Sequence, residues 1–135
     1  MNLTVQVITV SPQLINVNEE RDVNVIGNFD NEVEALKFTM INKPSIILLD
    51  YEIEKANTEL FIKSLLSESP ESKVILLGNL LPDEIILSCL ISSIYGYIEW
   101  KDVDKFLNKA IRSVGKGEGW VSRRLVGLLI RKLRG

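Results

Sequence analysis

Short runs rich in apolar and β-branched residues alternate along the chain with stretches in which apolar residues recur at helical spacing. The runs at 5–10, 23–27, 46–49, 74–77 and 96–100 predict five β-strands. The runs at 46–49 and 74–77 are apolar throughout, which is typical of strands that are covered on both faces.

The stretches between these strands predict helices. They begin near residues 31, 58, 83 and 102, and a last one begins after 122. The candidate N-caps are Asp30 or Asn31, Thr58, Asp102 and Ser122. Residues 13–22 are short, polar and rich in Asn, so they predict at best a poor helix.

Five alternations of strand and helix predict an α/β fold, a doubly wound parallel sheet with helices on both faces. In such sheets, sites lie beyond the carboxyl ends of the strands. The residues expected at this edge are Thr9, Val10 and Ser11, then Asp50, then Gly78 and Asn79, then Trp100 and Lys101.

Composition narrows the chemistry that this edge can perform. The chain has 135 residues, enough for one domain, with no histidine and one cysteine. The composition therefore excludes Ser-His-Asp and Cys-His catalysis, His-ligated metals and an internal disulfide. No signal peptide or membrane-length apolar run is present, so we expect a cytoplasmic chain without membrane contact.

Charge is divided unevenly between the body and the C-terminus. Residues 1–122 carry a net charge of −7, whereas residues 123–135 carry +5. An acidic body argues against nucleic-acid binding by the body itself. Five cations on an amphipathic helix are more often its solvated face than a phosphate site.

Several segments resemble response-regulator receiver domains of the NarL/FixJ (LuxR-type) subfamily. The stretch 44–50, PSIILLD, resembles the third strand of these domains, whose final Asp accepts a phosphoryl group. The segments 25–27 and 31–36 resemble the second strand and the following helix. The motifs around Pro70, Val74–Leu77, Asp83-Glu84 and Gly96-Tyr97 follow in the order and spacing of the subfamily.

The resemblance implies a CheY-like sheet of strand order 2-1-3-4-5. It also implies a receiver-like domain over 1–115 and a linker with a basic amphipathic helix over 116–135. In the subfamily, a DNA-binding helix-turn-helix domain follows this linker, so DNA contact is expected only through a domain outside this chain.

The phosphorylation pocket departs from the family pattern. A receiver has two acids at the end of strand one, and the matching positions hold Thr9 and Val10. The hydroxyl residue that ends strand four is replaced by Gly78, and the Lys that ends strand five by Trp100, with Lys101 one residue later. Asp50, the phosphoacceptor equivalent, remains. A lone carboxylate is a poor Mg²⁺ site, so bound Mg²⁺ is expected to be absent or weak, with no other cofactor or metal ligand.

The preferred hypothesis is therefore an atypical receiver, a non-enzymatic signalling and dimerisation module without conventional Mg²⁺-dependent phosphorylation. Two alternatives stay open. One is a functional phosphorelay receiver phosphorylated on Asp50, with Lys101 brought into reach by a bulge in the fifth strand. The other is a ligand-responsive module that uses the uncharged space left at Thr9, Val10 and Gly78.

The expected partners are proteins. In the family, the face built from the helix after 83, the strand at 96–100 and the helix after 102 mediates dimerisation or partner contacts, and a sensor kinase is an implied partner. The helix after 83 has hardly any charge beyond Glu84. The interface candidates on this side are Ile91, Ile94, Tyr97 and Trp100.

Overall fold

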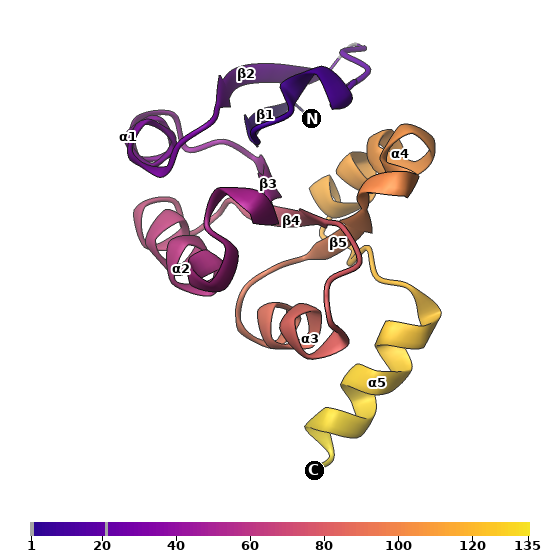
Figure 1. Ribbon diagram of the computed structural model, residues 1–135. Helices are drawn as coiled ribbons and strands as arrows, with labels where there is room; N and C mark the ends of the chain where they lie inside the picture. Colours follow the sequence, from indigo (N-terminus) through magenta and orange to yellow (C-terminus); the bar gives the residue numbers. More distant parts are fainter. Residues whose placement is uncertain (1, 21) are drawn as a thin grey trace.

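A computed structural model describes residues 2–20 and 22–135 (Figure 1). Five parallel strands form one sheet in the order β2-β1-β3-β4-β5, as predicted. The strands are β1 (Leu3–Ile8), β2 (Val23–Phe29), β3 (Ile46–Asp50), β4 (Lys73–Gly78) and β5 (Gly96–Glu99). The two apolar runs form β3 and β4 at the centre, where almost every side chain is buried.

The described residues form five α-helices beside the sheet, and each lies in a segment where helical spacing predicts one. They are α1 (Glu32–Asn42), α2 (Thr58–Glu68), α3 (Asp83–Ser92), α4 (Val103–Gly115) and α5 (Arg123–Leu133). Helices α1, α2 and α3 cover one face of the sheet, and α4 covers the other (Figure 1).

The described residues between β1 and β2 form no α-helix. It holds a 3₁₀ turn, η1 (Pro12–Leu14), followed by an extended segment. Ile15 and Val17 from this segment pack against the core on the α4 side. The expectation of a poor helix over 13–22 is confirmed within the described residues, but strict fivefold alternation of strand and helix is wrong. The extended segment after η1 covers the β1–β2 side of the sheet where a helix was expected.

Two of the four predicted N-caps are confirmed. The Asn31 side chain accepts a hydrogen bond from the Glu34 amide, and Ser122 Oγ accepts one from the Leu125 amide. Thr58 is instead the first residue of α2, after the short 3₁₀ turns η2 (Tyr51–Ile53) and η3 (Lys55–Asn57). Asp102 flanks α4 without a side-chain capping bond.

A buried polar group joins the sheet to α1. Gln6 lies on β1 with no exposed surface, and its Nε2 donates to the Ala35 carbonyl at 3.0 Å. Thr39 Oγ1 donates to Gln6 Oε1 at 2.6 Å. Both functional groups of this amide are thus paired, which is the condition for burying them without a large penalty.

The C-terminal segment folds back along the edge of the sheet. Trp120 forms a parallel bridge with Gly96, in which the Tyr97 amide donates to the Trp120 carbonyl. A Cβ at Gly96 would lie 3.0 Å from Trp120 Cβ, so a glycine allows this close approach. Helix α5 then packs against α3 through buried Leu125. Within the described residues, no helix has the length and apolarity required to cross a bilayer.

Candidate functional site

The carboxylate of Asp50 lies at the carboxyl edge of the sheet, where the last residue of β3 was expected. Its side chain is buried, with 2% of its surface exposed. Thr9 Oγ1 donates to Asp50 Oδ2 at 2.8 Å, and the Glu52 amide donates to Asp50 Oδ1 at 3.0 Å. Each carboxylate oxygen therefore already accepts a hydrogen bond from the protein.

Thr9 and Val10 follow β1, at the positions where the family has its acids, but the two side chains differ in orientation. Thr9 is 2% exposed, and its hydroxyl accepts a hydrogen bond from the Ser11 amide while donating to Asp50. Val10 is 55% exposed and presents an apolar side chain to solvent. Parallel pairing of Ile8 with Leu49 places the ends of β1 and β3 side by side, which brings Thr9 to Asp50.

Gly78 ends β4, and the space beside it is filled. A Cβ added there would lie 2.6 Å from Leu81 Cδ1 and 2.8 Å from the Tyr97 hydroxyl. The hydroxyl residue that receivers carry at this position therefore could not fit unless these neighbours moved. The neutral space expected at Gly78 is occupied by the protein's own side chains.

Trp100 and Lys101 lie beyond the end of β5, in the 3₁₀ turn η4 (Trp100–Asp102), rather than in the strand. Trp100 packs against the core on the α4 side. Lys101 is exposed and lines a cavity near the C-terminal segment, and no described ion pair joins it to Asp50. Strands β4 and β5 pair in regular register, so no bulge in β5 turns Lys101 toward the Asp50 carboxylate.

The side chains around Asp50 provide one carboxylate for a hard cation. Among the described residues, no group of three or more acidic or thiol side chains is arranged to hold a metal ion. Mg²⁺ prefers several oxygen ligands in octahedral geometry and gives up its water reluctantly. Thr9, which donates its proton to Asp50, does not replace a second carboxylate in this donor set.

The predicted interface candidates are only partly accessible. Ile94 and Tyr97 are buried, at 5% and 7% exposure, so their side chains offer little surface to a partner in the single chain. Ile91 is 46% exposed, and Trp100 is half-buried. Helix α5 of the same chain packs against part of the side of α3 that the sequence leaves without charge.

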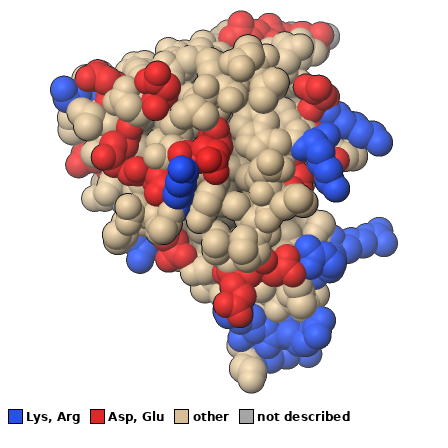
Figure 2. Space-filling model, in the orientation of Figure 1, with Lys and Arg blue, Asp and Glu red and all other residues tan. Residues whose placement is uncertain are grey.

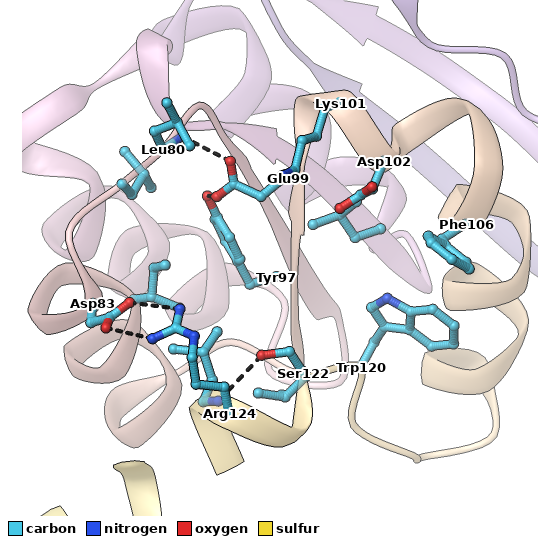
Figure 3. Close-up of a pocket in the computed structure, with 15 residues that line it drawn as sticks. Leu80, Asp83, Tyr97, Glu99, Lys101, Asp102, Phe106, Trp120, Ser122 and Arg124 are labelled. Atoms are coloured by element: carbon cyan, nitrogen blue, oxygen red, sulfur yellow. Dashed lines mark hydrogen bonds and ion pairs between the residues drawn. The ribbon is translucent and has the colours of Figure 1, made fainter. Parts of the chain in front are cut away.

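A cavity of about 490 Å³ lies where β5, α3 and the C-terminal segment meet (Figure 3). Tyr97 donates its hydroxyl hydrogen to the Glu99 carboxylate, which also accepts a hydrogen bond from the Leu80 amide. Burial, and secondarily the Glu99 carboxylate, raise the pKa of the Tyr97 phenol well above its ordinary value. The phenol therefore remains a neutral hydrogen-bond donor at the base of this cavity.

An ion pair closes the same cavity from the α5 side. Arg124 makes two hydrogen bonds to Asp83, at 2.7 and 3.0 Å, and this contact lowers the pKa of the Asp83 carboxyl (Figure 3). The rings of Phe106 and Trp120 lie 6.1 Å apart on the opposite side. The cavity is therefore bounded jointly by the domain and its C-terminal helix.

Two acids come together at a second place, in a groove of about 470 Å³ between α1 and α2. Burial and, after it, the adjacent Glu32 carboxyl raise the pKa of Glu54 to about 7. Among the described residues, no basic side chain forms an ion pair with either acid. Val33 and Leu60, 56% and 66% exposed, line this groove together with the acids.

Two of these features escape sequence reasoning. The Glu32–Glu54 pair joins residues 22 positions apart, and only the packing of α1 beside the turn after β3 brings them together. The burial of Gln6 cannot be predicted from the sequence either, because a polar residue in an alternating strand normally faces solvent. A third feature, the exposed side chains of Val126, Ile130 and Leu133 on α5, could have been found from their spacing, since these residues lie four and three positions apart.

The fold and its carboxyl-edge aspartate define a class of protein. A five-stranded parallel sheet of order 2-1-3-4-5 that carries Asp50 at the end of β3 has the architecture of response-regulator receiver domains. Solved structures agree on the fold. A LuxR-family two-component response regulator from Aurantimonas superposes with a TM-score of 0.79 at 12% identity, covering all of both chains. The isolated REC domain of RcsB from Salmonella enterica superposes with a TM-score of 0.81 at 18% identity, over 96% of this chain and 99% of that one.

Sequence relatives narrow the class further. The chain is 30% identical over 117 residues to the oxygen regulatory protein NreC of Staphylococcus aureus, and 29% identical to NreC of Staphylococcus epidermidis. These matches cover 86% of this chain but 54% of NreC, so the chain spans about half the length of these relatives. No family model matches the chain. Fold and relatives together identify the chain as a receiver domain of the NarL/LuxR type.

Proposed function

We propose that this receiver domain transmits a signal through protein contacts and without Mg²⁺-dependent phosphorylation of Asp50. The proposal rests on one observation. Both oxygens of the Asp50 carboxylate are held by the protein itself, by the Thr9 hydroxyl and the Glu52 amide. Thr9 thus occupies the place of an acid that a working receiver uses for its metal.

The physical argument concerns charge. Phosphoryl transfer to a carboxylate brings two anionic groups together, and the repulsion must be neutralised by a metal, a cation and a hydrogen-bond donor. At Asp50, the donor set does not fit Mg²⁺, Lys101 lies elsewhere, and the space beside Gly78 holds Leu81 and Tyr97. Each of the three neutralising contributions is therefore missing or displaced at this carboxylate.

Incubation with acetyl phosphate and Mg²⁺, followed by intact-mass spectrometry, tests the proposal. We expect no phosphoryl adduct, and no Mg²⁺-dependent signal from bound beryllofluoride in ¹⁹F NMR. The REC domain of RcsB, whose structure has been determined in the presence of BeF₃⁻, serves as the positive control. A stoichiometric adduct that disappears in Asp50→Asn would contradict the proposal and favour a phosphorelay role.

The place of this domain in a longer protein is also part of the proposal. The NreC relatives are nearly twice as long as the matched region, which leaves room for a second domain. One solved structure with a similar fold contains two RcsB dimers bound to two parallel DNAs. We propose that this chain likewise serves a transcriptional regulator as a non-enzymatic dimerisation module, with DNA contacted by a separate domain.

A further inference from the structure

Helix α5 carries two apolar rows, and the domain covers one of them. Leu125 is buried against α3, and Leu128 and Leu129 pack beside it. The second row, Val126, Ile130 and Leu133, is 40%, 45% and 66% exposed. At a rise of about 1.5 Å per residue, this row extends for about 10 Å along the helix.

Two cations flank the exposed row. Arg123 lies three residues before Val126, and Arg134 lies four residues after Ile130, so helical spacing places both beside the row. Neither guanidinium forms an ion pair with a described residue, whereas Arg124, on the docked side, is paired with Asp83. Figure 2 shows basic side chains gathered at the end of the molecule where α5 lies.

The groove between α1 and α2 has the complementary composition. It combines exposed Val33 and Leu60 with the carboxyls of Glu32 and Glu54, which have no basic partner among the described residues. Lys37, also in the groove, lies 3.9 Å from Glu34. Two adjacent acids that repel each other would be stabilised by an incoming guanidinium, which binds carboxylates with several donors at once.

We propose that α5 of one copy docks into the α1–α2 groove of a second copy, with Val126, Ile130 and Leu133 over Val33 and Leu60, and Arg123 and Arg134 against Glu32 and Glu54. An amphipathic helix in an apolar groove is a common mode of recognition. In a twofold dimer the contact is made twice, which doubles the buried area. This inference deepens the proposed dimerisation role by naming its surface, and it leaves the chemistry of Asp50 aside.

The charges favour a second copy over other occupants. Pairing of α5 with another α5 would oppose like charges, whereas the body of the chain supplies the acids that α5 lacks. Part of the surface that the sequence predicts for dimerisation, around α3 and β5, is already occupied by α5 and the Trp120 bridge of the same chain. The α1–α2 groove, in contrast, stays open.

Sedimentation velocity on the whole chain, over a concentration series at low salt, tests the dimer. We expect self-association that weakens as salt is raised. The groove variant Glu32→Arg/Glu54→Arg and the helix variant Arg123→Glu/Arg134→Glu should each bind themselves at least about tenfold more weakly, because each then opposes like charges. Mixed in equal amounts, they should form a heterodimer, because both contacts between them are complementary.

A matched control reverses two exposed lysines on α4, Lys105→Glu and Lys109→Glu, and should leave the dimer unchanged. If this control loses the dimer and the groove variant does not, the interface lies on α4. That result would overturn the inference about α5 and the groove, but the proposed dimerisation role would stand. A stronger dimer in the helix variant would indicate pairing of α5 with α5. A wild-type chain that stays monomeric but binds anionic vesicles would overturn both the inference and the dimerisation role.

Discussion

At the scale of single residues, the candidate site depends on what surrounds one aspartate. Asp50 is retained, but Thr9 takes the place of an acid and Leu81 fills the space beside Gly78. The pocket is therefore both depleted of charge and physically occupied. A substitution at Gly78 would require Leu81 to move, because the added Cβ would lie 2.6 Å from Leu81 Cδ1, and it would supply neither of the acids that the end of β1 lacks.

The first prediction concerns the hydroxyl of Thr9. Thr9→Val keeps the shape of the side chain but leaves Asp50 Oδ2 and the Ser11 amide without their partner. Urea unfolding should show a loss of about 1–3 kcal/mol, as expected for a polar group left buried and unpaired. Thr9→Ser, which keeps the hydroxyl, should lose less. An equal loss in both variants would show that packing, and not the hydrogen bond, accounts for the effect.

The second prediction concerns Glu54, whose pKa is raised to about 7 by burial and by the Glu32 carboxyl. Because its folded pKa lies above the ordinary value of 4.5, the folded state holds this proton more tightly than the unfolded state does. Its contribution to stability is therefore full below about pH 4.5 and is lost as the pH rises through 7. The chain has no histidine to titrate in the same window.

Glu54→Gln cannot lose this proton. Its melting temperature should match that of the wild type near pH 5 and exceed it near pH 8, by about 1–4 °C, since solvent screening limits the effect to less than about 1 kcal/mol. Glu32→Gln should also flatten the pH dependence, because it removes the neighbouring carboxyl. A wild-type melting temperature that does not fall between these pH values would contradict the assignment.

At the scale of elements, the C-terminal helix behaves as part of the domain. Its Ser122 cap, the bridge from Trp120 to Gly96, the pair of Arg124 with Asp83 and the buried side chain of Leu125 all fix α5 against α3 and β5. The exposed ion pair contributes little by itself. Most of the docking energy therefore comes from the buried apolar row.

The third prediction concerns Leu125, the buried residue that we expect to contribute most to the docking of α5. Leu125→Ala should weaken docking of α5 by about 2 kcal/mol and raise the hydrogen-exchange rate of its amides by about thirtyfold. Val126→Ala, on the exposed row of the same helix, is the matched control and should leave these rates nearly unchanged in the monomer. Equal acceleration in the two variants would mean that α5 is not held through Leu125.

At the scale of the whole molecule, the order of the elements could be predicted because local pattern and topology agree. The runs that form β3 and β4 are apolar on both faces, and Asn31 and Ser122 are caps within reach of their own helices. The site could be predicted only in outline. The position of Asp50 at the sheet edge can be predicted from the apolar run that precedes it. Its hydrogen bond with Thr9 depends on the register of β1 with β3, which no local pattern encodes.

Long-range packing also accounts for what the sequence misplaces. The sequence pattern predicts Ile94 and Tyr97 as interface residues, but both are buried in the folded chain. The C-terminal segment, which reverses direction after α4 and pairs with Gly96, packs beside them. Thr58 was expected to cap a helix, yet η3 takes that place because the chain turns at Lys55, where φ is 49°. A positive φ at a lysine has no signature in composition or periodicity.

The last prediction concerns the division of charge between body and tail. The body carries −7 and the tail +5, and Arg124 is paired with Asp83, which leaves four tail cations without an ion pair among the described residues. Fluorescence anisotropy should detect no binding of this chain to duplex DNA near physiological salt, because the acidic body repels the phosphates. Any binding at low salt should follow log[salt] with a slope no steeper than about −3.6, the value for four phosphate contacts. A steeper slope would mean that cations beyond these four, Arg124 or lysines of the body, also contact phosphate, and it would contradict the confinement of DNA contact to the tail.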